Sequence, residues 1–284
     1  IAPAMNTAML ENPATQENLQ TLMRYGMHII QPAVGMLACK DVGSGKLPEP
    51  ETLVEEINRV LARQKDMAGL HVTVTAGPTQ EALDPVRFLT NHSSGKMGYA
   101  IAREAMLRGA EVTLISGPVA LEAPMGVRLV RVTTARDMLE AVQAALPGTD
   151  ILVKAAAVAD YRPAAVAENK LKKGEGDMSI PLERTADILA WVAEHRHPGL
   201  YVCGFSMETE HMLENSRAKL RKKHLDMIAA NNLKTPGAGF AVETNVLTLI
   251  TPDGVTALPL MPKAQVAQAL LTEILRRRSA LSTD

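Results

Sequence analysis

Four consecutive residues, Ser93-Ser94-Gly95-Lys96, have the chemistry of an anion-binding site. They stand where apolar residues begin to recur at helical spacing, so the serines occupy the position of an N-cap and a helix should begin near Ser94. The first N–H groups of a helix and the positive end of its dipole attract phosphates. A motif this short fits an ordinary capped helix with a solvated lysine at least as well. It is not a Walker A loop, because Met97 stands where Ser or Thr should follow the lysine.

Three later groups of charged residues could act on the same anion. Asp160 follows a hydrophobic run and could hold a divalent cation beside phosphates. Three lysines lie in the four residues from Lys170 to Lys173, in a loop that could close over a polyphosphate. Lys219 and Lys223 are four residues apart in a helical segment, so they share one face. Each group also has a simpler explanation. Asp160 could be a cap, the lysine loop could be an ordinary solvated loop, and Lys219 and Lys223 could lie on a solvated helix face.

The segments that carry these residues alternate between strands and helices. Residues 72–75 form a β-branched run that ends at a turn, and a polar loop of about fifteen residues follows, which is long enough to be functional. This alternation predicts the α/β class, with a doubly wound Rossmann-like parallel sheet, an antiparallel hairpin near the C-terminus, and sites at the carboxyl ends of the strands. The other strands expected are 111–116, 129–132, 151–153, 201–204 and 227–231, with a hairpin of 245–250 and 254–258, and helices at 94–109, 137–145 and 263–278.

Residues 1–66 are expected to form a unit separate from the main domain, 67–284, because a short charged connector lies between them. The pattern of this first unit is a strand end at 1–6, a helix at 12–25 and a strand at 28–30. Such a unit is too small to have a complete core. Because the chain opens on Ile1 in mid-pattern, we expect the unit to be a truncated α/β segment.

Composition narrows the class of protein further. The 284 residues are 46% hydrophobic and 21% charged, with a net charge of -1, so no overall charge attracts nucleic acid or a membrane surface. No apolar run approaches the length of a membrane span. The two cysteines, Cys39 and Cys203, are too few for a disulfide framework. We therefore expect a cytoplasmic protein without nucleic-acid or membrane partners.

The string DPVRFLTNHSSGKMG, from Asp84 to Gly98, closely resembles the signature loop of the phosphopantothenate–cysteine ligase family. Segments 156–162 (AAVADYR), 170–173 and 185–188 resemble further motifs of that family in the same order, and the resemblance covers about 72–278. Members of the family join the carboxylate of 4′-phosphopantothenate to the α-phosphate of CTP with Mg²⁺, release pyrophosphate, and transfer the acyl group to L-cysteine with loss of CMP. The resemblance implies these three substrates, this metal ion and this acyl-cytidylate intermediate.

The resemblance also implies roles for single residues. Asn91 would bind the acyl intermediate and promote the second half-reaction, with help from Arg87, and Lys170 would activate the nucleotide and the carboxylate. Asp160 would support the metal ion. From the residues alone, Asn91 could equally be a turn residue, and Phe205 a core aromatic. The nucleotide-binding residues implied are Ser93, Ser94, Gly95, Ala156, Asp160, Lys170, Thr185, Ala186, Asp187, Ile188, Phe205, Lys219 and Lys223.

The first unit resembles a different family, the phosphopantothenoylcysteine decarboxylases. Residues 3–6 (PAMN) resemble its substrate-contacting motif, and residues 38–41 (ACKD) resemble its substrate clamp. By this resemblance Asn6 binds the substrate carboxylate and Cys39 is the decarboxylase proton donor, with FMN bound by the full-length protein. A turn asparagine and a buried small cysteine are the simpler explanations. Because Lys40 replaces the usual glycine of the clamp and most of the flavin site lies outside this sequence, we expect this flavoprotein-like segment to be inactive by itself.

Two other functions fit the fold. A Rossmann-type nicotinamide oxidoreductase would need a glycine fingerprint after the first strand and a Tyr-x-x-x-Lys pair, and the sequence has neither. A non-catalytic regulatory or binding protein of the same family is the second possibility. The presence of Asn91, Asp160 and Lys170 argues against it. Since related ligases are dimers whose two chains complete each site, the resemblance implies a homodimer through the ligase domain, and a higher oligomer where the decarboxylase domain is complete.

Overall fold

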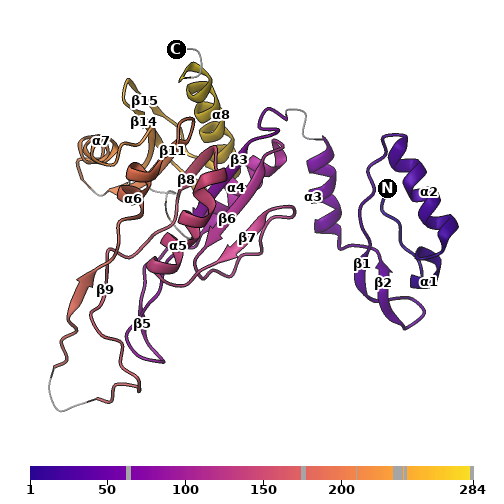
Figure 1. The fold of residues 1–284 in the computed structure, drawn as a ribbon, viewed down its shortest axis with the longest axis horizontal. Coiled ribbons are helices and arrows are strands. Elements are labelled where there is room, and N and C mark those ends of the chain that lie inside the picture. Colours follow the sequence, from indigo (N-terminus) through magenta and orange to yellow (C-terminus); the bar gives the residue numbers. More distant parts are fainter. Residues whose placement is uncertain (62–64, 174–176, 209, 233–238, 240–241, 282–284) are drawn as a thin grey trace. The chain divides into compact units, whose positions relative to one another are not determined.

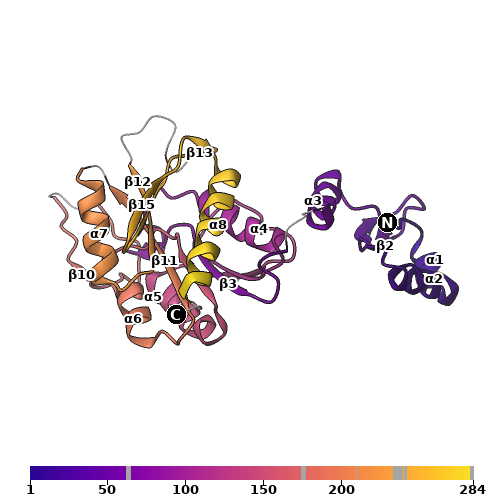
Figure 2. The ribbon, with the colours of Figure 1, turned by 90° about the horizontal axis from the view of Figure 1, so that it is seen from above.

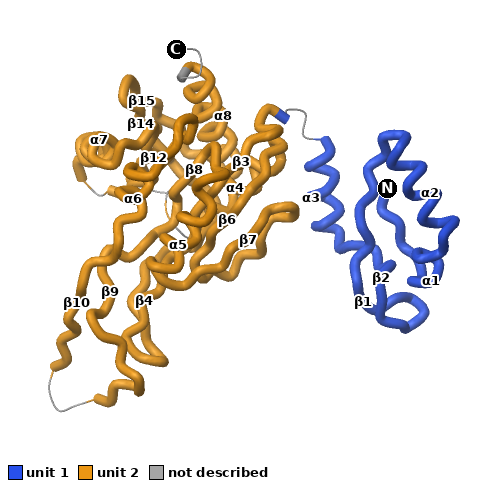
Figure 3. Tube along the Cα trace, in the orientation of Figure 1, with its two compact units in different colours: residues 1–65 blue, residues 66–284 orange. Residues whose placement is uncertain are grey.

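The computed structural model describes residues 1–61, 65–173, 177–208, 210–232, 239 and 242–281. The chain divides into two compact units, a smaller one of residues Ile1–Lys65 and a larger one of residues Asp66–Asp284 (Figure 3). The division lies one residue before the boundary expected from the sequence.

The smaller unit combines three helices with one antiparallel hairpin. Asn12 caps the second helix by accepting a hydrogen bond from the Ala14 N–H at 3.0 Å, with Pro13 in the first turn. The strand predicted at 28–30 is wrong, because Pro32 follows it and the backbone of this segment pairs only with Ile1 among the described residues. The elements are α1 Thr7–Leu10, α2 Pro13–Arg24, β1 Ala33–Met36, β2 Val42–Lys46 and α3 Pro50–Leu61.

The larger unit is built on an eight-stranded sheet. Six strands are parallel, and the last two form the predicted antiparallel hairpin at one edge. The doubly wound fold predicted from the sequence is therefore confirmed. In spatial order the strands are β15 Gly254–Ala257, β14 Thr248–Thr251, β12 Met227–Asn232, β11 Tyr201–Glu208, β8 Ile151–Lys154, β3 His71–Ala76, β6 Glu111–Ser116 and β7 Arg128–Arg131.

Helices cover both faces of this sheet, as Figures 1 and 2 show. Val74 points into a core with Ile101 and Leu270, while Leu152 points into a second core with Met138 and Leu189. Among the described residues, no helix has the length and apolarity needed to cross a membrane. The helices are α4 Lys96–Leu107 and α8 Lys263–Leu281 on the first face, and α5 Ala135–Ala145, α6 Ile188–His195 and α7 Met212–Lys222 on the second.

Helix α5 begins two residues before its predicted start. Thr134 and Asp137 form a capping box, in which the Asp137 N–H donates to Thr134 Oγ1 at 3.1 Å and the Thr134 N–H donates to Asp137 Oδ2 at 2.9 Å. The reciprocal bonds satisfy two N–H groups of the first turn, so the helix begins at Ala135.

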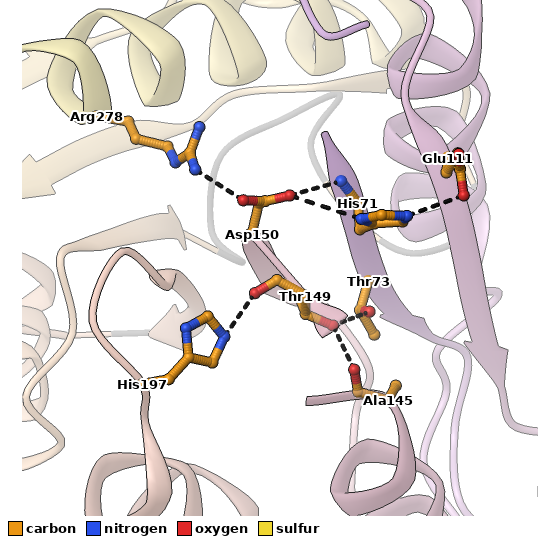
Figure 4. A network of polar contacts seen from close by, with 8 residues as sticks. All are labelled: His71, Thr73, Glu111, Ala145, Thr149, Asp150, His197 and Arg278. Atoms are coloured by element: carbon orange, nitrogen blue, oxygen red, sulfur yellow. Dashed lines mark hydrogen bonds and ion pairs between the residues drawn. The ribbon is translucent and has the colours of Figure 1, made fainter. Parts of the chain in front are cut away.

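The amino edge of the sheet is fixed by a polar network (Figure 4). Asp150 accepts a hydrogen bond from the His71 N–H at 2.8 Å and another from Arg278 at 2.8 Å, which ties β3 and the end of α8 to the start of β8. Beside it, the hydroxyls of Thr73 and Thr149 lie 2.7 Å apart. The strands are thus held together at the edge opposite their carboxyl ends.

A long arm projects from the larger unit (Figure 1). It consists of two small antiparallel pairs with the loops that join them. Exposed apolar side chains gather on this arm, including Phe88, with 48% of its surface exposed, and Val166, with 58%. Its strands are β4 Glu81–Ala82, β5 Phe88–Leu89, β9 Tyr161–Pro163 and β10 Leu182–Arg184, and a further small pair elsewhere is β13 Thr244–Asn245 with β16 Met261–Pro262.

Candidate active site

Strands β3 and β8 lie side by side in the middle of the sheet, and the chain leaves them in opposite directions. From β3 it continues to β6 and β7 on one side, whereas from β8 it continues to β11 and β12 on the other. The carboxyl ends of such a strand pair are the usual ligand site of an open α/β sheet. The loops after both strands meet here, because the Ala157 N–H donates to Gly77 O at 2.9 Å and the Thr79 N–H donates to Ala157 O at 3.2 Å.

A pocket of about 600 Å³ opens at this point, and we call it the central pocket. It brings together nine of the predicted site residues, which are distributed over more than a hundred positions of the chain. These nine are Asn91, Ala156, Asp160, Thr185, Ala186, Asp187, Phe205, Lys219 and Lys223. A larger hollow of about 690 Å³ lies near the amino edge, against β3, β6, β7 and α5, and contains none of the predicted residues.

Helix α6 begins at the wall of this pocket. Asp187 caps it by accepting a hydrogen bond from the Ala190 N–H at 3.0 Å, and it also forms an ion pair with Lys223. Burial opposes ionisation of Asp187, but the hydrogen bonds from Lys223 and the Ala190 N–H, together with the charges of Lys223 and Lys154, outweigh it and lower the pKa of the carboxyl. Ile188 is buried in the second core, so only its backbone is available to a ligand.

Lys219 of α7 and Lys223, the residue that ends this helix, line the pocket from its other side. Lys219 donates to Phe205 O at 2.9 Å, and burial lowers the pKa of its ammonium group. The predicted shared face of Lys219 and Lys223 is thus present, and it is directed at the pocket. Phe205 is half-buried between the sheet and this space.

Asn91 joins the two loops at the carboxyl edge. Its side-chain amide donates to Ala157 O at 2.6 Å, and its Oδ1 accepts from the Ser93 N–H at 3.0 Å. The turn geometry considered from the sequence is therefore present, and the residue also borders the pocket.

The serine cap predicted for α4 is wrong. The N-cap is Gly95, with φ of 77°, and no side chain caps this helix. A Cβ on Gly95 would lie 2.9 Å from Val119 Cγ1, so the position needs both the left-handed backbone and the small size of glycine. Ser93, Ser94 and Gly95 border a hollow of about 60 Å³ next to the central pocket, and Lys96 pairs with Glu243.

Asp84, to which the sequence motifs assigned no role, is buried and links the signature loop to the segment after Lys170. Its carboxylate accepts two hydrogen bonds from the Arg87 guanidinium, at 2.6 and 3.0 Å, and one from the Leu171 N–H at 3.1 Å. Arg87 in turn donates to Leu171 O at 2.8 Å. The hydrogen bonds from Arg87 hold the pKa of the Asp84 carboxyl well below its usual range. Together they fasten the residue next to Lys170 to the signature loop.

Lys170 and Arg87 do not line the central pocket. Lys170 is exposed, in the loop that Asp84 and Arg87 hold at Leu171. The sequence signal for Asp84 was its position before Pro85 and three residues before an arginine, which is typical of an Asx turn.

In the smaller unit, the two residues singled out from the sequence are in contact. The Asn6 side-chain amide lies 3.2 Å from Cys39 Sγ, while its Oδ1 caps α1 by accepting from the Ala8 N–H at 2.8 Å. Cys39 is exposed, unlike the buried cysteine considered as an alternative. Lys40 has φ of 68°, a left-handed conformation that favours glycine.

Replacing Lys40 with Gly should stabilise the smaller unit by about 0.5–1 kcal/mol, because the left-handed backbone costs a side chain about that much. Lys46→Gly is the matched control, since Lys46 lies in β2 without a left-handed backbone and its loss should destabilise the unit. Urea unfolding of the full chain, monitored by hydrogen exchange of residues 1–61, measures the change in stability of each variant. A destabilised Lys40→Gly variant would contradict the strain at this position.

Comparisons with known proteins agree with both halves of this description. The family described as "DNA/pantothenate metabolism flavoprotein C-terminal domain" matches residues 67–277, and the family described as "Flavoprotein" matches residues 1–62. The coenzyme A biosynthesis bifunctional protein CoaBC of Vibrio vulnificus is 46% identical over 276 residues, which are 96% of this chain and 69% of that protein. CoaBC of Bacillus subtilis is 45% identical over 278 residues, which are 96% of this chain and 68% of the Bacillus protein.

A solved structure shows the same fold. The crystal structure of the C-terminal domain of CoaBC superposes with a TM-score of 0.65 at 42% identity, and covers 78% of this chain and all of that one. Identity at this level over the whole domain, with the motifs gathered at one edge of the sheet, establishes the family. The chain belongs to the CoaBC family of coenzyme A biosynthesis and carries its phosphopantothenate–cysteine ligase domain, preceded by part of its flavoprotein domain.

Proposed function

We propose that the larger unit joins 4′-phosphopantothenate to L-cysteine with CTP through an acyl-cytidylate, and that the nucleotide occupies the central pocket. The observation that carries this proposal is the convergence of Asp160, Lys219, Lys223 and the α6 cap at the carboxyl ends of β8 and β11. Such an arrangement of cations and helix N-terminal amides suits a polyphosphate.

In the first half-reaction the pantothenate carboxylate attacks the α-phosphorus of CTP. An oxygen–phosphorus bond forms, and the bond to the pyrophosphate leaving group breaks. Lys219 and Lys223 lie where they can neutralise charge on the leaving group, and Lys170 would be brought in by its loop. The Ala156 N–H donates a hydrogen bond to Thr75 Oγ1 at 3.1 Å, so it is not available to the nucleotide. The Ala156 carbonyl would accept a hydrogen bond from the cytosine amino group.

Asp160 fits the expected Mg²⁺ in this arrangement. Its carboxylate borders the pocket and has no hydrogen-bond or ion-pair partner among the described residues, so it is available as an oxygen ligand beside phosphate oxygens. When bound, the ion would supply charge neutralisation on the phosphates.

In the second half-reaction the cysteine amine attacks the acyl carbon, and CMP leaves. Asn91 would hold the intermediate, since its amide lies on the pocket wall between the two loops. Arg87 would assist this step indirectly, by holding the loop that carries Lys170 through its hydrogen bond to Leu171 O.

Substituting Lys170 with Gln tests this assignment. We expect pyrophosphate release from CTP and 4′-phosphopantothenate to fall about 100-fold, because a cation that neutralises charge on the phosphates is lost. Lys222→Gln on α7 removes the same charge from an exposed position and should leave the rate unchanged. Equal turnover in the wild type and Lys170→Gln would count against the proposed role.

We also propose a homodimer through the arm. Six exposed apolar side chains on one projecting element suggest a protein interface, and related ligases are dimers. Phe88→Asp or Val166→Asp should shift the protein from dimer to monomer in analytical ultracentrifugation, raising the dimer dissociation constant at least about tenfold. Leu213→Asp on α7 is the control. The six side chains are Val86, Phe88, Tyr161, Val166, Met178 and Leu182.

For the whole protein we propose the second activity of the family, FMN-dependent decarboxylation of phosphopantothenoylcysteine. The contact of Asn6 with the exposed Cys39 thiol supports substrate binding and proton donation by these residues. An exposed free thiol also suits a reducing cytoplasm.

The alternatives are less well supported. Family membership favours the ligase over a nicotinamide oxidoreductase. A non-catalytic protein would not need the charged groups that converge on the central pocket.

A further inference from the structure

Lys154 is a charged residue at the centre of the sheet to which no motif assigns a role. It is the last residue of β8, paired in register with Thr75 of β3 and Gly204 of β11. Its side chain lines the central pocket, where it interacts electrostatically with Lys219, Asp187 and Asp160. The residue is therefore on the floor of the pocket, between the two loops that form the site.

The two other lysines that line this pocket have protein partners. Lys219 donates to Phe205 O at 2.9 Å, and Lys223 pairs with Asp187. The ammonium group of Lys154 has no hydrogen-bond or ion-pair partner within the part of the chain that the structure describes. Lys154 is half-buried, and an ammonium group that is partly withdrawn from water without a partner is costly, so this position is poised for an anion that the protein does not supply.

The residues paired with Lys154 on the two neighbouring strands carry no negative charge. Gly204 lies beside it on the same face of the sheet, and the position that a Cβ would take there is only 2.7 Å from Leu225 Cδ1, so an apolar side chain fills this space. On the other side, the Thr75 hydroxyl oxygen accepts a hydrogen bond from the Ala156 N–H. Burial, with a smaller contribution from the charge of Lys219, lowers the pKa of Lys154 to about 8, as expected for an ammonium group that lacks an anion.

We propose that Lys154 binds a phosphate oxygen of the nucleotide directly, from the floor of the central pocket. This inference rests on the proposed function, because it assumes that a nucleoside triphosphate is the occupant. Lys154, Lys219, Lys223 and Arg184 line the pocket against two carboxylates, Asp160 and Asp187. The excess of positive charge suits a polyphosphate.

Nucleotide binding to full-length variants tests this assignment. CTP with Mg²⁺ is titrated by calorimetry and cytidine by NMR into wild type, Lys154→Met and Lys154→Arg, with Lys222→Gln as the matched loss of charge. Lys154→Met should weaken CTP binding about 10- to 100-fold and leave cytidine binding unchanged, because only a phosphate contact is lost. Lys154→Arg should retain part of the affinity for CTP.

The ligand-free melting temperature separates this role from a structural one. Without ligand, Lys154→Met should melt at the same temperature as the wild type or higher, because it removes a half-buried charge that has no partner. Unchanged CTP affinity, an equal loss for cytidine and CTP, or a lower ligand-free melting temperature would overturn the role of Lys154. A wild type that does not bind CTP would instead overturn the proposed function, and the Lys154 assignment with it.

Discussion

Replacing Asn91 with Asp should stop amide formation while one equivalent of pyrophosphate per site is still released from CTP. The substitution removes the donor that holds Ala157 O at 2.6 Å and places a carboxylate against that carbonyl oxygen and the intermediate. Loss of a preorganised donor of this kind lowers rates about 100- to 1,000-fold. The first half-reaction depends on lysines elsewhere in the pocket and should continue. Acyl-cytidylate should then accumulate and be detectable by mass spectrometry.

The neighbouring residue gives the control. His92→Gln changes an exposed side chain in the same loop and should leave both half-reactions intact. If Asn91→Asp formed the amide at the wild-type rate, or lost pyrophosphate release to the same degree as amide formation, Asn91 would not be specific to the second step.

Asp84→Asn should lower kcat/KM for CTP about 100-fold without unfolding the larger unit. Asparagine keeps the shape but loses the charge that holds the Arg87 guanidinium and the Leu171 N–H. The loop that carries Lys170 would then lose its tether to the signature loop, and a displacement of about 1 Å can cost that factor in rate. Steady-state kinetics with varied CTP measures the effect, and circular dichroism confirms the fold.

A double-mutant cycle makes this prediction specific. Asp84→Asn and Arg87→Gln act on one tether, so the double variant should be little worse than the poorer single variant. Additive losses in kcat/KM would show that Asp84 and Arg87 act independently, which would contradict a shared tether. Glu122→Gln, a carboxylate outside this network, is the control for charge alone.

The strands and the site at their carboxyl ends followed from the sequence because local patterns determine them. The strand predicted at 111–116 is β6 with the same bounds, and the hairpin predicted around Gly254 is present; its place at the edge of the sheet was not predicted. The grouping of Asp160 with Lys219 could be predicted because both follow neighbouring strands of a doubly wound sheet. The family motifs supplied the rest of the nucleotide-binding set.

Other features depend on contacts between distant residues, which local patterns do not show. Gly95, and not a serine, is the N-cap of α4, and a side chain there would collide with Val119, 24 positions further along the chain. Asp84 accepts a hydrogen bond from the N–H of Leu171, 87 positions away. Lys154 interrupted a hydrophobic run, and only the placement of β11 beside β8 shows that it lies in the pocket. The arm was not predicted, since its two-residue strands are too short to give a period.

The fate of the carboxylate oxygen distinguishes an acyl-cytidylate from any other activated form of 4′-phosphopantothenate. The enzyme would be given CTP, Mg²⁺, L-cysteine and 4′-phosphopantothenate labelled with ¹⁸O in its carboxylate, and the products analysed by mass spectrometry. Attack of the carboxylate on the α-phosphorus predicts that one labelled oxygen appears in CMP and none in pyrophosphate. Label in orthophosphate, with CDP as the nucleotide product, would indicate an acyl phosphate and contradict the acyl-cytidylate mechanism. Amide formation without any label in a nucleotide or phosphate product would exclude both.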